Sequence, residues 1–317
     1  MMAAGGGARP VATVIFGEAL VADFTTEQLV GGAPFNVARN LAAFMAPQLM
    51  VTRIGSDANG AAVRAEFERF AMSERGLQLD RMEETGRVLV ERQPGGGHRT
   101  VIVPKQAYDF IDPQQALEAV AEVTPSAIYF GTLAQRGRRS HDTLYKLFDA
   151  SGATRFLDLN LRDGQTDRGC VSESLHAATI VKVNEEELQA LFSWYFQIAP
   201  DTALDSDEAR AACGALLDMF ALEALILTLG HRGSVYFGAD GALIVNRDNP
   251  APPFVIDTAG AGDAFCAIFL LGRARGWPLE LTLARANEFA GAICAVSGAV
   301  PGDIGFYDQW VTRWRAS

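Results

Sequence analysis

The stretch Val255-Ile256-Asp257-Thr258-Ala259-Gly260-Ala261-Gly262-Asp263-Ala264-Phe265 decides the fold of this 317-residue chain. The apolar run Phe254–Ile256 predicts the buried end of a strand, and the apolar run 264–271 predicts a buried helix. A strand that enters a helix through Gly-Ala-Gly leaves the first N–H groups of that helix unpaired and accessible. These donors, with the positive end of the helix dipole, suit an anion such as a phosphate.

Asp263 lies in the same predicted first turn. A carboxylate repels a phosphate, so a loop that only binds phosphate gains nothing from an acid at this position. An acid at this position is explained if it acts as a general base, which takes a proton from a hydroxyl group that attacks phosphorus. The alternative is structural, because an acid near the start of a helix also favours the helix dipole.

The segment Asp257-Thr258-Ala259-Gly260-Ala261-Gly262-Asp263 resembles the C-terminal signature of the ribokinase-like (PfkB-type) sugar kinases. The resemblance implies that Asp263 is the base and that the amides of Gly260, Ala261 and Gly262 form an anion hole. It also implies an α/β fold, namely a three-layer, Rossmann-like, mostly parallel sheet with helices on both faces and a small β lid. ATP and Mg²⁺ are the implied cofactors, and many relatives bind a monovalent cation such as K⁺ near Asp257.

A second signature, Gly31-Gly32-Ala33-Pro34-Phe35-Asn36, precedes an amphipathic helix. Two glycines let the start of that helix approach a ligand, and Pro34 fits its first turn. Taken alone, the segment is better explained as a plain loop-to-helix turn with Asn36 as a helix cap. The segment resembles the N-terminal signature of fructokinase-type members, which implies that Gly31, Gly32 and Asn36 hold the sugar.

One position departs from the family pattern. Members of the family usually have an acid five residues after the glycine that ends the first strand. This acid binds hydroxyl groups of the sugar. This chain has Gly17 followed by Ala22, and its acid is Asp23. A shift of one residue turns a side chain to the other face of a strand. Either a bulge returns Asp23 to the sugar, or the sugar has one contact fewer.

From about residue 115 onward, predicted helices alternate with predicted strands, which indicates a parallel sheet with crossover helices. Asp158-Leu159-Asn160-Leu161-Arg162 ends one of these strands and resembles a fructokinase-type signature. It implies sugar or phosphate contacts for Asn160 and Arg162, although Arg162 could also form a surface ion pair. In the Gly55-x-Asp57-x-x-Gly60 element, by contrast, Asp57 is interpreted as a helix cap.

The remaining site residues follow from the same resemblance. Asn184-Glu185-Glu186-Glu187 matches an Asn-x-x-Glu element, in which Glu187 would organise hydrated Mg²⁺; these acids also favour the dipole of a helix. The resemblance assigns the nucleotide side of the site to Lys182, Asn184, Thr228, Gly230, Gly233 and Asn287.

Domain organisation follows from patterning and resemblance. Residues 1–10 are expected to be a flexible, cytoplasmic N-terminus without a signal core, and residues 11–317 a single kinase domain. The β lid is expected from about 18–30 and 86–110, with a hairpin tip at Gly95-Gly96-Gly97.

Composition restricts the class of protein. A hydrophobic fraction of 49% supports a large core, and no apolar run approaches the ~20 residues of a membrane span. The net charge of −11 argues against nucleic acid as a partner. The four cysteines show no Cys-x-x-Cys pair, and the four histidines show no zinc-binding cluster.

These observations favour an ATP-dependent sugar kinase, with fructose as the first candidate. Ribose, 2-keto-3-deoxygluconate or a similar sugar stay open as alternatives, as does a catalytically silent sugar-binding relative. A dinucleotide-binding oxidoreductase is rejected because no GxGxxG turn follows the first strand, and a P-loop kinase because GxxxxGK[ST] is absent. The partners are a sugar and ATP, and the oligomeric state, including a homodimer, stays open.

Overall fold

A nine-stranded sheet forms the centre of the computed structural model, which describes residues 8–24, 28–92, 98–162, 164–199, 206–247 and 254–315. Its strand order is β13-β12-β11-β10-β9-β8-β1-β4-β5. All neighbours pair in parallel except β11–β12 and β12–β13, which are antiparallel. The strands are β1 Val11–Phe16, β4 Gln48–Gly55, β5 Leu77–Asp80, β8 Thr124–Phe130, β9 Thr154–Asp158, β10 Ile180–Asn184, β11 Ala224–Thr228, β12 Ser234–Gly238 and β13 Leu243–Asn246.

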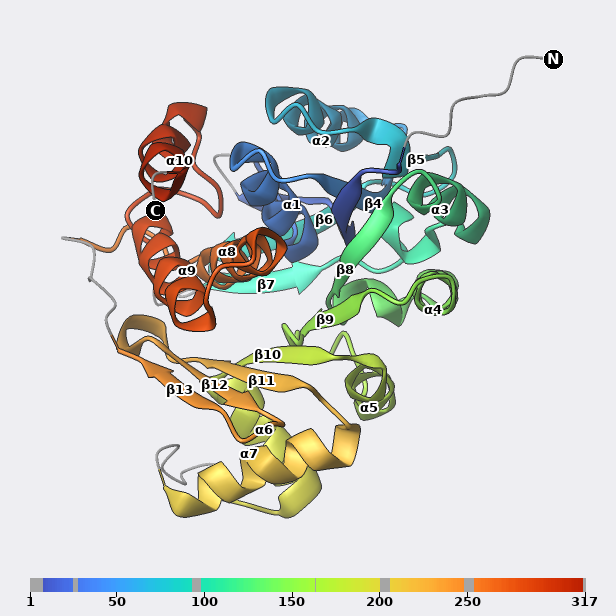
Figure 1. Ribbon diagram of the computed structural model, residues 1–317. Helices are drawn as coiled ribbons and strands as arrows, with labels where there is room; N and C mark the ends of the chain where they lie inside the picture. Colours follow the sequence, from blue (N-terminus) through green and yellow to red (C-terminus); the bar gives the residue numbers. More distant parts are fainter. Residues whose placement is uncertain are drawn as a thin grey trace.

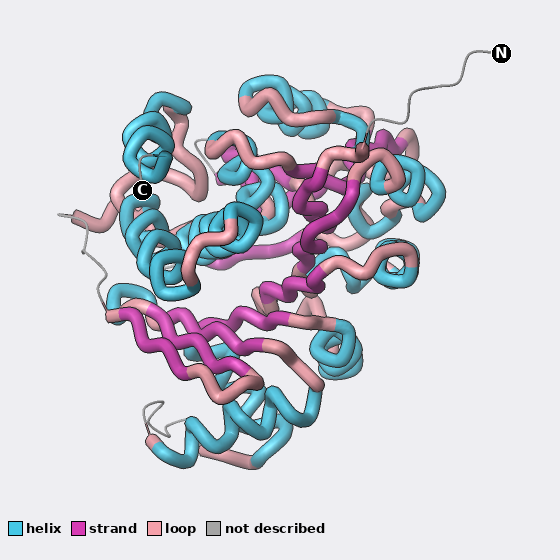
Figure 2. Tube along the Cα trace, viewed as in Figure 1, coloured by secondary structure: helices cyan, strands magenta, loops and turns pink. Residues whose placement is uncertain are grey.

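Helices cover both faces of this sheet, so the molecule has the three predicted layers (Figures 1 and 2). One face, at the upper left of Figure 1, carries α1 Ala33–Ala43, α2 Ala58–Arg69, α8 Ala261–Arg275, α9 Leu279–Ile293 and α10 Asp308–Arg315. The other carries α3 Pro113–Val120, α4 Arg138–Asp149, α5 Arg168–Ala177, α6 Glu185–Phe196 and α7 Asp207–Phe220. Short 3₁₀ turns connect them: η1 Glu74–Gly76, η2 Ala107–Phe110, η3 Leu133–Arg136, η4 Gly230–Arg232 and η5 Ile304–Tyr307.

Two hydrophobic cores lie on the two faces of the sheet. Val14 of β1 belongs to the core under α3–α7, whereas its neighbour Ile15 belongs to the core under α1, α8 and α9. Successive side chains of a strand point to opposite faces, so a strand covered on both sides is apolar at nearly every position. This is why β1 reads as one continuous apolar run.

A second, four-stranded sheet matches the predicted lid. Its order is β3-β2-β6-β7, with β2 Leu20–Phe24, β3 Gln28–Gly31, β6 Gly86–Arg92 and β7 His98–Ile102. β2 begins four residues after β1 ends, at Leu20 after Phe16, so the chain passes from the central sheet to the small one through Gly17 to Ala19. The predicted hairpin tip at Gly95 to Gly97, residues 25–27 and most of the predicted N-terminal segment 1–10 lie outside the described residues.

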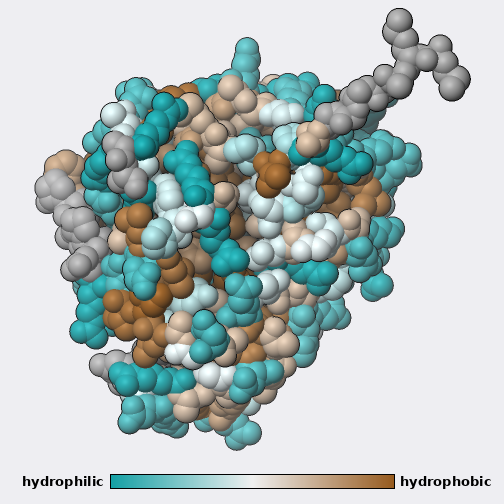
Figure 3. Space-filling model, in the orientation of Figure 1, coloured by the Kyte–Doolittle hydropathy of each residue, from teal (hydrophilic) through white to brown (hydrophobic). Residues whose placement is uncertain are grey.

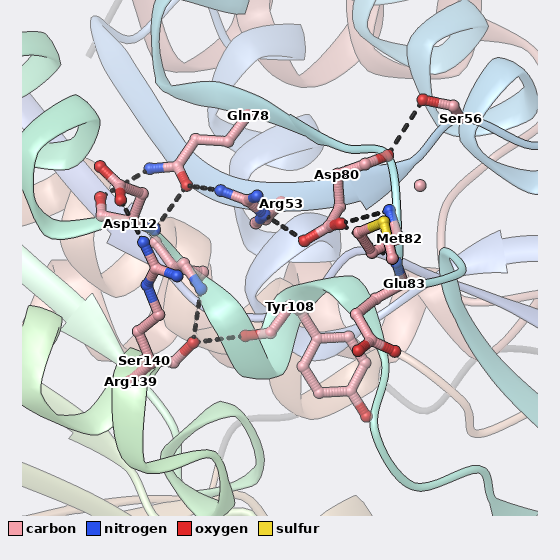
Figure 4. Close-up of polar contacts among 12 residues, drawn as sticks. Arg53, Ser56, Gln78, Asp80, Met82, Glu83, Tyr108, Asp112, Arg139 and Ser140 are labelled. Atoms are coloured by element: carbon pink, nitrogen blue, oxygen red, sulfur yellow. Dashed lines mark hydrogen bonds and ion pairs between the residues drawn. The ribbon is translucent and has the colours of Figure 1, made fainter.

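A polar network ties the β4–β5 edge of the central sheet to η2 and α4 (Figure 4). Arg53 of β4 donates to Asp80 at 2.7 Å, and Gln78 of β5 accepts the backbone N–H of Asp112 at 2.6 Å. The Ser140 hydroxyl of α4 donates to the carbonyl of Tyr108 at 2.7 Å. The network thus fixes η2, which follows the small sheet in the chain.

Two sequence predictions need correction. Phe254–Ile256 is not the buried end of a strand, because its side chains are about 60% exposed in an irregular segment. The backbone N–H of Ile256 donates to the carbonyl of Cys294. This segment therefore lies against the C-terminal end of α9 and does not pair with the sheet. The strand predicted over 155–162 ends at Asp158, where the chain continues as a loop.

Exposed apolar side chains gather over the β12–β13 end of the sheet, where Leu243 and Val245 of the edge strand are about half exposed (Figure 3). No helix within the described residues has the length and apolar character needed to cross a membrane.

Candidate active site

The first turn of α8 presents open backbone donors. Its N-cap Gly260 has φ +76°, and a Cβ there would lie 2.3 Å from the carbonyl oxygen of Ala299. Only glycine fits this position without strain. Ala261 donates its N–H to Thr258 at 3.3 Å, whereas the N–H groups of Gly262 and Asp263 have no acceptor within the described part of the chain. The predicted turn therefore has two unpaired donors at the positive end of a 15-residue helix.

Asp263 is the partly buried acid beside these donors. Its carboxylate accepts a hydrogen bond of 2.7 Å from the side-chain amide of Asn36. Burial and the nearby charge of Asp158 raise the pKa of Asp263 to about 6, although the Asn36 bond and the charge of Lys182 oppose the rise. A carboxylate with this pKa is a stronger base than a solvated one and is still ionised at neutral pH.

A chain of polar side chains on α1 and α2 fixes Asn36. Arg39 donates to the side-chain oxygen Oδ1 of Asn36 at 2.6 Å and to the Glu66 carboxylate at 2.6 Å. Arg39 is 3% exposed, and Glu66 is also paired with Arg69. With its oxygen held by Arg39, the Asn36 amide has its NH₂ group directed at Asp263. The two predicted signatures therefore meet at one hydrogen bond.

Below the same turn lies a buried ion pair. The Lys182 ammonium is 3.0 Å from the Asp158 carboxylate, and both side chains are almost fully buried. Asp158 also accepts from the Tyr129 hydroxyl at 3.0 Å and from the Cys266 thiol at 3.5 Å. Burial alone would lower the pKa of Lys182, but the charges around it, Asp158 first, outweigh burial and raise it.

The Lys182 side chain is therefore buried, and its contact with the nucleotide stays a prediction. Its ammonium lies 3.2 Å from the point where a Cβ on Gly262 would stand. The positive charge of Lys182 thus lies next to Gly262, in the first turn of α8.

The loops after β9 and β10 bring together the predicted residues of the middle of the chain. Asn184 caps α6, and Glu187 completes a capping box with it. One Glu187 oxygen accepts the N–H of Asn184 and the other accepts the N–H of Leu161, both at 2.9 Å. Glu187 therefore holds the loop that carries Asn160, which has φ +42°, and the exposed Arg162. Burial raises the pKa of Glu187.

Asp23 does not take the place of the missing acid at Ala22. The register from Leu20 to Phe24 against β6 is continuous, so no bulge turns Asp23 around. Its carboxylate pairs with Arg87 on the neighbouring strand instead. The hydrogen bonds from Arg87 lower the pKa of Asp23.

Glu18 is a residue that the sequence analysis did not single out. It is only 3% exposed, and the charges of Arg162 and Asp263 act on its carboxylate. The sequence feature that could have pointed to Glu18 is an acid directly after Gly17, where the chain passes from the central sheet to the small sheet.

The predicted nucleotide residues divide into two groups. Thr228 is the last residue of β11, and Gly230 and Gly233 lie in the turn that follows it. Gly233 has φ +92° and leaves no room for a side chain. Asn287 is instead 4% exposed and donates to the Ser234 hydroxyl at 3.0 Å. It joins α9 to β12 in the interior, and its contact with the nucleotide stays a prediction.

Asp257, near which a monovalent cation is predicted, connects its own loop to the loop that contains Gly298. Its carboxylate accepts from the N–H of Ala259 at 2.9 Å and from the N–H of Gly298 at 3.3 Å. Among the described residues, no cluster of three or more His, Cys, Asp or Glu side chains could hold a metal ion. A cation held by carbonyl oxygens or through water needs no such cluster.

The chain is similar to known proteins of one family. The family model described as "pfkB family carbohydrate kinase" matches residues 9–303. A fructokinase from Salmonella typhimurium is 24% identical over 264 residues, which cover 80% of each chain. A ribokinase from Arabidopsis thaliana is 28% identical over 287 residues, which cover 87% of this chain and 70% of the relative.

A solved structure of a Vibrio cholerae fructokinase double mutant, in fructose, ADP and potassium ion bound form, matches with a TM-score of 0.74. It is 20% identical, and the match covers 93% of this chain and 95% of the other. At this identity the likeness establishes the fold alone.

Proposed function

This chain belongs to the PfkB family of carbohydrate kinases, and from that premise we propose that it transfers the γ-phosphate of ATP to a hydroxyl group of fructose. Membership of the family makes the protein a phosphotransferase that acts on a carbohydrate. The choice of sugar, the roles of single residues and the cofactor details are our proposals.

The observation that carries the proposal is the position of Asp263 beside two unpaired N–H groups. In the proposed reaction, Asp263 accepts the proton of a sugar hydroxyl while the hydroxyl oxygen attacks the γ-phosphorus of ATP. The bond from that phosphorus to the bridging oxygen breaks, and ADP leaves with the electron pair. The amides of Gly262 and Asp263 stabilise the charge on the transferring group, as preorganised donors do.

The residues present fit a magnesium ion held through water. Both Glu187 oxygens already accept one backbone N–H, and each keeps lone-pair capacity for a metal-bound water. Mg²⁺, when bound, neutralises charge on the nucleotide phosphates. Thr228, Gly230 and Gly233 would hold the nucleotide, and the loops joined by Asp257 would hold a monovalent cation such as K⁺.

Fructose is the first candidate because of the fructokinase-type signatures and the fructokinase relative. The ribokinase relative and the absence of an acid at Ala22 keep ribose, 2-keto-3-deoxygluconate and similar sugars as alternatives. In each case Gly31, Gly32 and Asn36 would face the sugar from one side, and Asn160 and Arg162 from the other.

A panel of sugars assayed with ATP and Mg²⁺ tests the proposal. We expect sugar-dependent formation of ADP and of a sugar phosphate, with the highest kcat/KM for fructose. A higher kcat/KM for another sugar would reassign the substrate. Binding of a sugar without any turnover would identify a catalytically silent relative. A cytoplasmic location and a homodimer stay predictions.

A further inference from the structure

Glu18 has a buried carboxylate without a donor from any other described residue. The side chain is 3% exposed, and the one donor to its carboxylate among the described residues is the backbone N–H of Glu18 itself. Burying a charged group without hydrogen bonds is costly, so native structures pair such groups almost always. With a single local donor, this buried carboxylate can accept further hydrogen bonds, and a bound molecule can supply them.

The position of Glu18 places it next to the sugar-binding turn. It lies between the end of β1 and the start of β2, where the chain enters the small sheet. Its Cγ atom lies 3.3 Å from the point where a Cβ on Gly32 would stand. Four residues farther, Asn36 donates to Asp263. Glu18 and the base thus lie on two sides of one glycine turn.

Charged groups from three other elements act on this carboxylate. Arg162 follows β9, Arg136 belongs to η3 and Asp263 belongs to α8; Tyr108 of η2 also faces it. Burial raises the pKa of Glu18 to about 7, and the charge of Asp263 adds to the rise, whereas the two arginines oppose it.

We propose that Glu18 is a sugar-binding residue whose carboxylate accepts hydrogen bonds from hydroxyl groups of the sugar that Asp263 activates. This inference rests on the proposed kinase function. A sugar offers several O–H donors, which is what a buried, ionised carboxylate needs. Glu18 would then supply the contact that Ala22 cannot make, from the first residue after Gly17 instead of the fifth.

Glu18→Gln tests this role, because glutamine keeps the shape of the side chain and removes its charge. We expect the KM for the sugar to rise about tenfold to a hundredfold, as for the loss of hydrogen bonds to a charged group. The KM for ATP and the melting temperature should stay near their wild-type values. If Glu18→Gln does not fold, Glu18→Asp keeps the charge at a shorter reach and should raise the KM for the sugar as well.

Asp23→Asn is the matched control. Asp23 is the acid closest to the position of Ala22, but it pairs with Arg87 in the small sheet. We expect this variant to change the KM for the sugar less than threefold. An increase in that KM for Asp23→Asn, with none for Glu18→Gln, would overturn the inference and assign the contact to Asp23. The inference would also be overturned if both variants had the kinetic constants of the wild-type enzyme.

The pH dependence of kcat/KM for the sugar distinguishes a sugar-binding role of Glu18 from a purely structural one. In the wild-type protein, kcat/KM for the sugar should fall as pH drops through about 7, because the protonated Glu18 no longer accepts two hydrogen bonds. Glu18→Gln should lack this step. A wild-type chain that phosphorylates no sugar would overturn the proposed function, and this inference with it. An active enzyme whose step near pH 7 persists in Glu18→Gln overturns the inference alone.

Discussion

The side-chain amide of Asn36 donates a 2.7 Å hydrogen bond to the carboxylate of Asp263, 227 residues farther along the chain. Asn36 lies near the start of α1 and Asp263 near the start of α8, and the two helices pack against each other. The proposed base is thus oriented by the residue that the sequence assigned to the sugar. An amide that contacts both groups would place a sugar hydroxyl next to its base.

Asp263→Asn should lower kcat by about a hundredfold or more, the scale of losing a general base. The amide keeps the size of the side chain, so the open N–H groups of α8 should still bind nucleotide. ATP binding measured by calorimetry should therefore stay near the wild-type value while turnover falls. Unchanged turnover would refute the assignment of the base.

The wild-type enzyme should lose kcat as pH falls below about 6. The base works in its ionised form, and the pKa of Asp263 is raised to about 6 by burial and by the charge of Asp158. Protonation below that pH removes the proton acceptor. A kcat that stays constant down to pH 5 would contradict an ionised Asp263 as the base.

Asn36→Ala should raise the KM for the sugar much more than the KM for ATP. The variant also removes a hydrogen bond that lowers the pKa of Asp263, so the loss of kcat should begin at a higher pH than in the wild type. A pH profile of kcat separates these two effects. A larger rise in the KM for ATP than in that for the sugar would show that the two ends of the pocket are misassigned.

Lys182→Met should cost about 3–5 kcal/mol of unfolding free energy, because it leaves the buried Asp158 without its partner. The lost positive charge should also raise the pKa of Asp263 and move the acid limb of kcat to higher pH. Asp158→Asn should move that limb to lower pH, because it removes a negative charge.

The double variant Asp158→Asn, Lys182→Met should recover much of the stability that Lys182→Met loses, since no unpaired charge is left buried. Denaturant unfolding of the three variants forms a double-mutant cycle. Additive losses would show that the two side chains do not act as a pair.

Gly260→Ala should destabilise the protein and lower kcat. Its φ of +76° costs alanine about 1–2 kcal/mol. The added Cβ would also meet the Ala299 carbonyl, and the turn would have to shift. Gly276→Ala is the control, because its φ of +68° is similar but its surroundings are open. The control should lose stability and keep kcat; a similar fall in kcat in both variants would show that the turn itself is not critical.

The sequence predicted the fold wherever patterning and local chemistry act together. Asp57 was predicted as a cap and does accept the N–H of Gly60 at the start of α2. β1 was readable because a strand covered on both faces is apolar throughout. Phe254–Ile256 has the same apolar character but lies exposed, since apolar runs alone do not specify a partner.

The site was predictable as far as backbone turns define it. Gly260 was readable because a turn that brings N–H groups to a ligand needs glycine. The pairing of Lys182 with Asp158 depends on the register of β9 against β10, which no local pattern contains. The partners of Asn287 and Asp23 could not be predicted for the same reason, because Ser234 and Arg87 lie on elements distant in the sequence.

The contact between α1 and α8 has a consequence for synthesis of the protein. If Asp263 is the base, as proposed, a growing chain lacks both the base and the open N–H groups of α8 until that helix has been made. A product truncated before α8 should then be inert instead of partly active.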